Sequence, residues 1–302
     1  GVLKGLLARV AAAAPAWAAA VAAACTLDAL LSLAAAAEAG AASGPMCRPT
    51  VVDAPASDPQ SLRASALRHP AADALLASAA AGAAAFVPND VALGGAAPPF
   101  VLLTGPNMGG KSTLLRQVCL AALAAHVGAW VPASSFALTT VDAIFVRMGA
   151  KDALLAGQST FAVELQEVAA PLARGTPRSL VALDELGRGT ATGDGAAIAG
   201  AVLAKLAGDV RCRGLFATHY HALADEAATT RTAAVMHMAA DVGGAVAPGR
   251  ERVTFLYKLT PGACPRSYGT NVARLAGVPD AVVDRAAALA AGLEAGAGLA
   301  VA

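Results

Sequence analysis

The first group of residues that could do chemistry begins at Gly105, where nine residues read G-P-N-M-G-G-K-S-T. Up to Ser112 they fit the pattern G-x-x-x-x-G-K-[ST], which is typical of loops that bind nucleotide phosphates. Glycines such as Gly109 and Gly110 let the backbone approach a ligand and turn its N–H groups towards phosphate oxygens. We expect Lys111 to reach the β- and γ-phosphates and the Ser112 hydroxyl to bind Mg²⁺. The alternative is a glycine-rich turn with a surface lysine.

A second group is the acidic pair Asp184 and Glu185, which follows the apolar run 180–183. An aspartate at the carboxyl end of a core strand lies beside a phosphate loop, where it can hold Mg²⁺ directly or through water. Glu185, one residue further on, is placed to polarise an attacking water molecule. The alternative is that the acidic pair only caps the next helix.

Two further polar residues are candidates for the same site. His219 follows the apolar run 213–218, and it is expected at the carboxyl edge of the sheet, where ligands of open α/β sheets bind. Ser159, in G-Q-S-T-F, offers a hydroxyl and backbone N–H groups at the start of a helix. The alternatives are a structural histidine and an ordinary helix N-cap.

Strands that alternate with helices are expected to position these residues. The expected strands are 100–104, 144–147, 179–183 and 213–218. The expected helices are 114–118, one that opens at the loop 157–161 and continues to about 172, 193–206 and 280–293. This order predicts an α/β fold with a largely parallel sheet covered by helices on both faces. Segments 235–240 and 253–259 indicate a hairpin at the sheet edge, and short strands are expected around 68–70 and 86–90.

The first part of the chain has a different texture from the rest. Residues 1–39 predict a helix, and Gly, Pro, Ser and Asp between 40 and 59 indicate a connection. At 302 residues, a main domain with a helical appendage is expected. The predicted division is an appendage at 1–45, a main domain at 46–295 and a tail at 296–302.

The composition could suggest a membrane protein, with 57% hydrophobic residues and a mean hydropathy of +0.58. Alanine supplies much of that value, and the uncharged segment Val10 to Leu27 contains Pro15. We interpret this segment as a buried, alanine-rich helix. Lys4 and Arg9 before it would also suit a secretory signal, but a chain that starts with glycine is expected to be an internal piece or a trimmed product.

Cysteines and charge narrow the function further. The five cysteines form no C-x-x-C pair and no zinc-like spacing, which predicts a reduced, intracellular protein without a structural metal. The formal net charge is +1 and the basic residues are scattered, so the chain shows no electrostatic footprint for nucleic acid.

Four motifs together resemble the MutS family of DNA mismatch-repair ATPases over about residues 17–290. They are the phosphate loop, L-D-E-L-G-R-G-T at 183–190, F-A-T-H-Y at 216–220 and S-Y-G at 267–269. Finer features resemble the eukaryotic branch called the sixth MutS homologue. These features are F-V-P-N-D at 86–90, G-T-A-T-G-D-G at 189–195, H-M at 237–238 and G-A-C-P-R-S-Y-G at 262–269.

The resemblance implies a P-loop NTPase fold of the ABC type, with the helical appendage as the end of lever helices. It implies ATP and Mg²⁺ as ligands, and hydrolysis at a composite dimer interface that controls a mismatch-binding DNA clamp. In such an interface Ser159 acts on the partner's nucleotide, Asn107 senses the γ-phosphate and His219 is a switch. It implies nucleotide-binding roles for Phe86, Val87, Gly105, Asn107, Gly109, Gly110, Lys111, Ser112 and Thr113, catalytic roles for Lys111, Glu185, His219 and Ser159, and Mg²⁺ ligation by Ser112 and Asp184.

The resemblance also implies partners and a compartment. These are the second MutS homologue as a dimer partner, mismatched duplex DNA through regions outside this chain, a MutL-type protein, no membrane, and the nucleus.

Three departures from the family pattern stand out: Ala191 replaces a serine, Lys151 precedes the Ser159 segment, and no F-x-E mismatch-reading motif is present. We therefore do not expect this piece to recognise mismatches by itself.

Three alternatives remain open at this point. The chain could belong to another MutS relative, such as one that suppresses recombination. It could instead be the ATPase of an SMC-like protein that organises DNA. The third alternative is a nucleotide-gated dimerisation module that binds ATP but turns it over negligibly.

Overall fold

A six-stranded sheet carries most of the residues singled out above. The computed structural model describes residues 1–55, 57, 60–78, 85–106, 108–149, 160–230, 233–243, 252–265 and 268–294. Within that part of the chain, the strand order of this sheet is β10-β9-β4-β8-β7-β6. Its strands are β4 (Phe100–Thr104), β6 (Ile144–Arg147), β7 (Leu180–Asp184), β8 (Arg213–Ala217), β9 (Ala233–Gly243) and β10 (Arg252–Pro261).

Neighbouring strands of this sheet run parallel except at one edge. β4 pairs with β8 and β9 in parallel, and β6, β7 and β8 continue the parallel order. β10 is antiparallel to β9, so the two strands form the predicted hairpin and β10 is the edge strand. The predicted edge hairpin is confirmed, and the sheet is mixed because its edge strand β10 runs antiparallel to the parallel strands.

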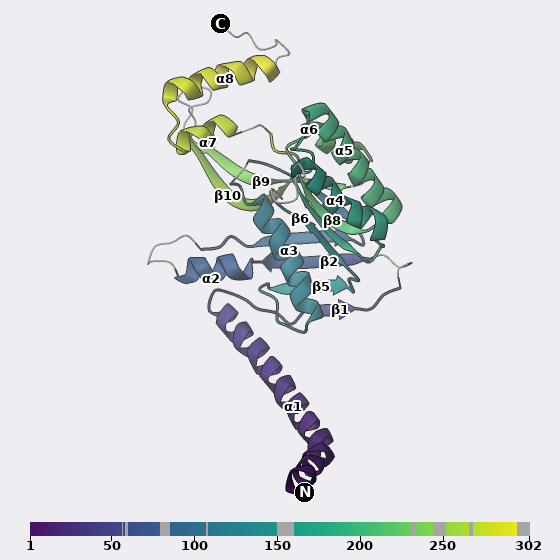
Figure 1. Ribbon diagram of the computed structural model, residues 1–302. Helices are drawn as coiled ribbons and strands as arrows, with labels where there is room; N and C mark the ends of the chain where they lie inside the picture. The colour runs from purple at the N-terminus through teal and green to yellow at the C-terminus, as the bar shows by residue number, and fades with distance from the viewer. Residues whose placement is uncertain are drawn as a thin grey trace.

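Helices cover both faces of this sheet, because side chains along each strand alternate between two cores. Val101 and Leu103 of β4 belong to the buried cluster that includes α3 (Lys111–His126). Phe100 and Leu102 belong to the cluster on the opposite face. The elements that cover that second face are α4 (Thr160–Arg174), α5 (Thr192–Ala204), the π-helical segment η2 (Lys205–Val210) and α6 (His221–Thr230) (Figure 1).

A second, four-stranded sheet was not predicted. Its order is β1-β5-β2-β3, from β1 (Thr50–Val52), β5 (Ser135–Thr139), β2 (Ser61–Leu67) and β3 (Asn89–Gly94). β2 is antiparallel to both of its neighbours, β3 and β5, and β1 is parallel to β5. The fold is therefore mixed α/β, and "mostly parallel" describes the larger sheet alone. The sequence signal was weak because small alanine and serine residues dilute the alternation in β2.

The helix α3 lies between the two sheets. Its residues Leu114 and Leu115 are buried in one cluster with Leu62 of β2 and Leu103 of β4. The first helical residue of α3 is Lys111, so the phosphate loop opens between the sheets. A short helix, α2 (Pro70–Ser78), was also missed by the sequence analysis and lies near the same end.

The N-terminal helix α1 (Val2–Ala41) matches the predicted helix but contradicts the prediction of burial. It extends away from the two sheets (Figure 1), and none of its residues, all of which the structure describes, is buried. Its apolar residues lie on all sides of the helix, as is typical of helices that pack against a partner. Leu27, Leu30 and Leu31 are about 60% exposed. By length and composition alone, α1 is also the one candidate membrane span among the described helices.

Two helices end the described chain: α7 (Gly269–Leu275) and α8 (Asp280–Glu294). The second agrees with the helix expected at 280–293. The predicted tail at 296–302 lies outside the described residues. The domain boundaries at 45 and 295 stay a prediction.

Candidate functional site

The phosphate loop connects the end of β4 with the start of α3. Gly105 and Gly110 have φ values of +128° and +97°, a region of backbone conformation that favours glycine. At Gly109 an added Cβ would lie 3.1 Å from the carbonyl oxygen of Pro106. The local geometry therefore explains why glycines occupy these positions, and it leaves the N-terminus of α3 facing the loop.

Lys111 is the buried cation of the site, with 4% of its surface exposed. Its Nζ donates hydrogen bonds to the carbonyl oxygens of Gly105, at 2.7 Å, and Pro106, at 3.1 Å. Burial lowers the pKa of Lys111, while the carboxylates of Glu185 and Asp184 raise it again in part. The ammonium group is thus held at the loop, where phosphate oxygens would complete its environment.

Ser112 and Asp184 meet as the sequence predicted. The Ser112 hydroxyl donates to Oδ2 of Asp184 at 2.5 Å, which joins the start of α3 to the end of β7. Asp184 is 7% exposed, and its Oδ1 is buried without a hydrogen-bond partner among the described residues. A buried, unpaired carboxylate oxygen beside a hydroxyl suits a hard cation. The two residues therefore fit Mg²⁺, which takes few protein ligands when phosphates supply the others.

Glu185 lies directly after β7 in a left-handed backbone conformation, with φ of +58°. Its Oε1 is 2.6 Å from Nε2 of His219, and its Oε2 forms an ion pair with Arg188. The hydrogen bond with His219 lowers the pKa of Glu185 most, Arg188 lowers it further, and burial opposes them. The site therefore holds Glu185 ionised, with its carboxylate oriented by two neighbours.

The glycine-rich turn after Glu185 is packed closely. The N–H of Gly187 donates to Oε1 of Glu164 at 2.5 Å, and its carbonyl accepts from the Tyr220 hydroxyl at 2.9 Å. A Cβ on Gly195 would lie 2.4 Å from the Gly187 carbonyl oxygen. These contacts hold the turn against α4 and α5, and thereby fix the position of Glu185 at the sheet edge.

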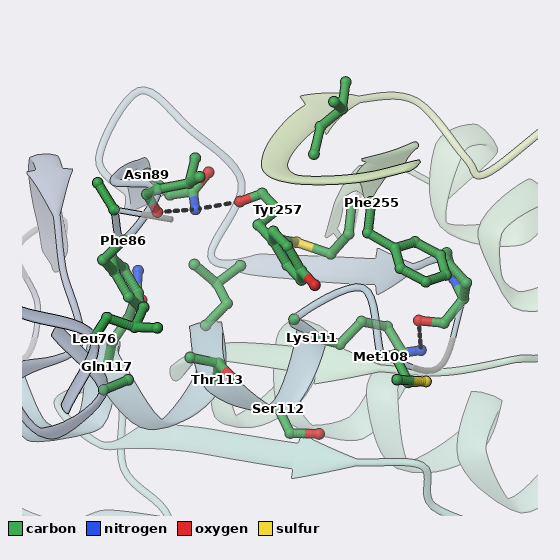
Figure 2. A pocket seen from close by; sticks show the side chains of 18 of the residues that line it. Leu76, Phe86, Asn89, Met108, Lys111, Ser112, Thr113, Gln117, Phe255 and Tyr257 are labelled. Atoms are coloured by element: carbon green, nitrogen blue, oxygen red, sulfur yellow. Dashed lines mark hydrogen bonds between the residues drawn. The ribbon is translucent and has the colours of Figure 1, made fainter. Parts of the chain in front are cut away.

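A cavity of about 730 Å³ extends from the phosphate loop to α2 (Figure 2). Lys111, Ser112 and Thr113 line its polar end, and Phe86 and Val87 line the other. In Figure 2, Phe86 lies beside Leu76 of α2, and Lys111 lies towards the opposite end. One polar end and one apolar end in a cavity of this size suit a nucleotide.

Tyr257 is a wall of this cavity that the sequence analysis missed. The register of β10 shifts between Phe255, opposite Ala240, and Leu259, opposite Met238, so the strand bulges towards the phosphate loop. Tyr257 lies in the bulge with φ of +53°. A Cβ on Gly110 would be 3.4 Å from Cδ1 of Tyr257, which places the ring against the loop.

Asn89 holds this bulge in place. Its Nδ2 donates to the Tyr257 carbonyl oxygen at 2.9 Å, and its Oδ1 accepts from the N–H of Leu259 at 2.6 Å. Asn89 is 3% exposed and belongs to β3, in the other sheet. The F-V-P-N-D sequence at 86–90 marked the segment, but the pairing of its asparagine with a strand far along the chain needs the tertiary structure.

The structure brings most predicted site residues together. The phosphate loop, Lys111, Ser112, Asp184, Glu185 and His219 lie at one sheet edge, and Thr113, Phe86 and Val87 line the adjoining cavity. Asn107 and Ser159 lie outside the described residues. Lys151 also lies outside them, as do Arg266 and Ser267 of the motif at 262–269.

Comparisons with known proteins bear on the family. A family model described as MutS domain V matches residues 101–294. The chain is 53% identical over 271 residues to DNA mismatch repair protein MSH6 of Arabidopsis thaliana and 44% identical over 277 residues to DNA mismatch repair protein Msh6 of Homo sapiens. Each alignment covers 89% of this chain and 20% of the relative.

A bacterial relative extends the comparison. DNA mismatch repair protein MutS of Roseiflexus sp. is 50% identical over 211 residues, which is 69% of this chain and 19% of that protein. The chain thus spans about a fifth of the length of these relatives. The matches agree with the motifs at the phosphate loop and after β7, and they confirm the resemblance to the sixth homologue. The chain belongs to the MutS family of DNA mismatch-repair proteins, and within that family it is MSH6-like.

Proposed function

We propose that this chain is the ATPase domain, of the ABC type, of a MutS-type mismatch-repair subunit. The observation that carries the proposal is one cavity whose size suits a nucleotide. Lys111, Ser112 and Glu185 line its polar end, and its other end is apolar. Asp184 adds a buried, unpaired carboxylate oxygen beside Ser112. These groups match the requirements of phosphoryl transfer to water.

Each residue has a role in this proposal. The loop backbone and Lys111 bind the phosphates, and Ser112 with Asp184 holds Mg²⁺. When bound, Mg²⁺ neutralises charge that develops on the phosphate oxygens. Glu185 orients the attacking water, and His219 orients Glu185 through their 2.6 Å hydrogen bond. Phe86 and Val87 line the apolar end for the adenine base.

The action of the whole protein is a further part of the proposal. Its relatives are named as DNA mismatch repair proteins and are about five times longer than this chain. We infer a composite site in which Ser159 reaches the nucleotide of a partner, a second MutS homologue, and Asn107 senses the γ-phosphate. Nucleotide state would control a DNA clamp outside this chain and the recruitment of a MutL-type protein in the nucleus.

The first test is binding and turnover of ATP by the whole chain, with and without Mg²⁺. Lys111→Ala is expected to weaken ATP binding, because it removes the ammonium group that is proposed to bind the phosphates. Glu185→Ala should preserve binding and lower turnover by about 10²–10⁴-fold, as loss of a positioned base does. Lys205→Ala, at an exposed lysine of η2, is the matched control and should change neither quantity. Turnover that survives Glu185→Ala unchanged would remove the role given to this residue.

The dependence of ATP affinity on Mg²⁺ tests the proposed metal site at Ser112 and Asp184. Ser112→Ala should reduce the gain in ATP affinity that Mg²⁺ produces, because the hydroxyl beside Asp184 is a proposed ligand. Affinity measured in EDTA should stay close to that of the unsubstituted chain. An equal Mg²⁺ effect in both proteins would contradict this assignment.

Two alternatives make different predictions. Family membership favours a MutS-type protein over the SMC-like alternative. A nucleotide-gated dimerisation module is suggested by the engagement of Glu185 with both His219 and Arg188. It predicts ATP binding without turnover in the single chain and in the mixed dimer, whereas the proposed ATPase predicts turnover in the mixed dimer.

A further inference from the structure

A buried ion pair lies between the nucleotide cavity and the base of α1. Arg68 follows β2, and its Nη1 is 2.9 Å from Oδ2 of Asp73 in α2. Arg68 and Asp73 are 3% and 6% exposed. Nη2 of Arg68 also donates to the carbonyl oxygen of Pro45, at 2.7 Å, in the connection that follows α1. One guanidinium therefore joins α2 to the connection that follows α1.

The chain is shaped to admit this guanidinium. Gly44 has φ of +147°, and a Cβ at that position would lie 2.4 Å from Nη1 of Arg68. The N–H of Arg68 donates to the carbonyl oxygen of Pro132 at 2.9 Å, which fixes its backbone. Burial of an arginine is unfavourable unless its hydrogen-bonding groups are well placed. The planar fork can bond two acceptors at once, which a lysine ammonium cannot reproduce in the same geometry.

Two contacts connect this pair to the nucleotide cavity. Ala72 and Leu76, on either side of Asp73 in α2, line the cavity. Gln117 of α3 also lines it, is 1% exposed, and donates from Nε2 to the carbonyl oxygen of Leu67 at 3.4 Å. Leu67 directly precedes Arg68. The segment that carries Arg68 is thus attached to two walls of the cavity.

Trp130 lies on the other side of the connection that follows α1. It lines a smaller cavity together with Ala37 and Ala41 of α1 and with Met46. Nη2 of Arg68 is 3.9 Å from the sulfur of Met46, and Met46 lines this smaller cavity together with Trp130. The chain contains two tryptophans, and the other, Trp17, lies exposed on α1. Trp130 is therefore a natural probe of the base of α1.

We propose that Arg68 is a positioning residue that couples nucleotide occupancy of the cavity to the placement of α1. The inference rests on the proposed nucleotide binding. A ligand between α2 and the phosphate loop changes the position of α2, and Arg68 transmits that change through Asp73 to Pro45. Coupling of this kind requires that α1 have two placements and that the nucleotide bind the chain with a different affinity in each.

The test uses the whole chain with Trp17→Phe, so that Trp130 is the single tryptophan. Acrylamide quenching of Trp130 is followed during titration with Mg²⁺ and ATPγS, a slowly hydrolysed analogue, and binding is measured separately by equilibrium dialysis. We expect a saturable change in quenching. Adding Arg68→Lys should remove most of that change while the dissociation constant stays within about threefold.

Controls separate coupling from folding. Arg63→Lys, at an exposed arginine of the strand that precedes Arg68, should leave the Trp130 response intact. Asp73→Asn is a second variant that loses the carboxylate, so it keeps the test informative where Arg68→Lys disturbs folding, as monitored by circular dichroism. Asp73→Asn should likewise lose the response and retain binding.

Two results would overturn the inference and leave the proposed function standing. One is a full Trp130 response in folded Arg68→Lys and Asp73→Asn chains. The other is a Trp17→Phe chain that binds ATPγS with no Trp130 response. A chain that binds no ATPγS would overturn both proposals together.

Discussion

Glu185 is the residue at which geometry and charge of the site meet. Its left-handed backbone turns the side chain away from β7, and His219 and Arg188 hold its two oxygens. Their combined effect is a carboxyl pKa below the ordinary value of 4.5, in spite of partial burial. The hydrogen bond with His219 and the ion pair with Arg188 therefore orient the Glu185 carboxylate and also stabilise the fold around the sheet edge.

This residue predicts a pH effect on stability. Because the pKa of Glu185 is lower in the folded than in the unfolded state, its stabilising contribution is present above about pH 4.5 and is lost as the pH falls through the folded value. Glu185→Gln should therefore lose less unfolding free energy than the unsubstituted chain when the pH falls from about 6 to 3, by up to about 1 kcal/mol. Urea denaturation at each pH measures the difference. Parallel curves for the two proteins would contradict the prediction.

At the scale of elements, the site depends on two sheets that meet around α3. Arg213, at the start of β8 and 1% exposed, joins them. Its guanidinium donates to the carbonyl oxygens of Ser61, at 2.7 Å, Thr139, at 3.2 Å, and Arg178, at 2.9 Å. Burial lowers the pKa of Arg213 to about 10, which leaves it charged at neutral pH.

Loss of this arginine should weaken the attachment of the two sheets to each other. Arg213→Met removes the guanidinium donors of several buried carbonyl oxygens, and we expect it to lower the free energy of unfolding by about 3 kcal/mol. Chemical denaturation provides the measurement, and Arg63→Met, at an exposed arginine of β2, should change stability by less than about 0.5 kcal/mol. Equal stability of the two variants would show that Arg213 does not hold the sheets together.

At the scale of the molecule, two features point beyond this chain. α1 exposes apolar side chains on all sides, and the chain spans 20% of the length of its MSH6 relatives. A helix of this composition is typical of a packed environment, so we expect α1 to pack against another protein surface. The proposed action of Ser159 likewise places part of the function in a partner.

A mixed dimer tests this shared site directly. ATP hydrolysis by this chain should increase, with saturation, on titration with the ATPase region of a second MutS homologue. With Lys111→Ala silencing the chain's own site, the remaining hydrolysis belongs to the partner, and adding Ser159→Ala should lower it. Ser134→Ala, at an exposed serine, is the control. Hydrolysis per site that is the same with and without the partner would contradict the composite site.

The sequence by itself determined the elements that depend on local patterns. The phosphate loop, the acidic pair at the end of β7, His219 after β8 and the hairpin at the sheet edge lie where predicted, because each follows from spacing within a short segment. Family membership followed from the same motifs. Burial of α1 was predicted wrongly, because apolar composition shows a preference for a partner but does not supply one.

The tertiary structure alone decided what depends on contacts between distant segments. The four-stranded sheet pairs β2 with β5, about seventy residues apart, and small residues weaken the alternation that would reveal it. The bulge at Tyr257 depends on its hydrogen bond with Asn89, and the placement of Arg68 depends on its contacts with both Pro45 and Asp73. Such side chains find their partners only when the core is packed, because their positions depend on the register of strands and not on neighbours in the chain.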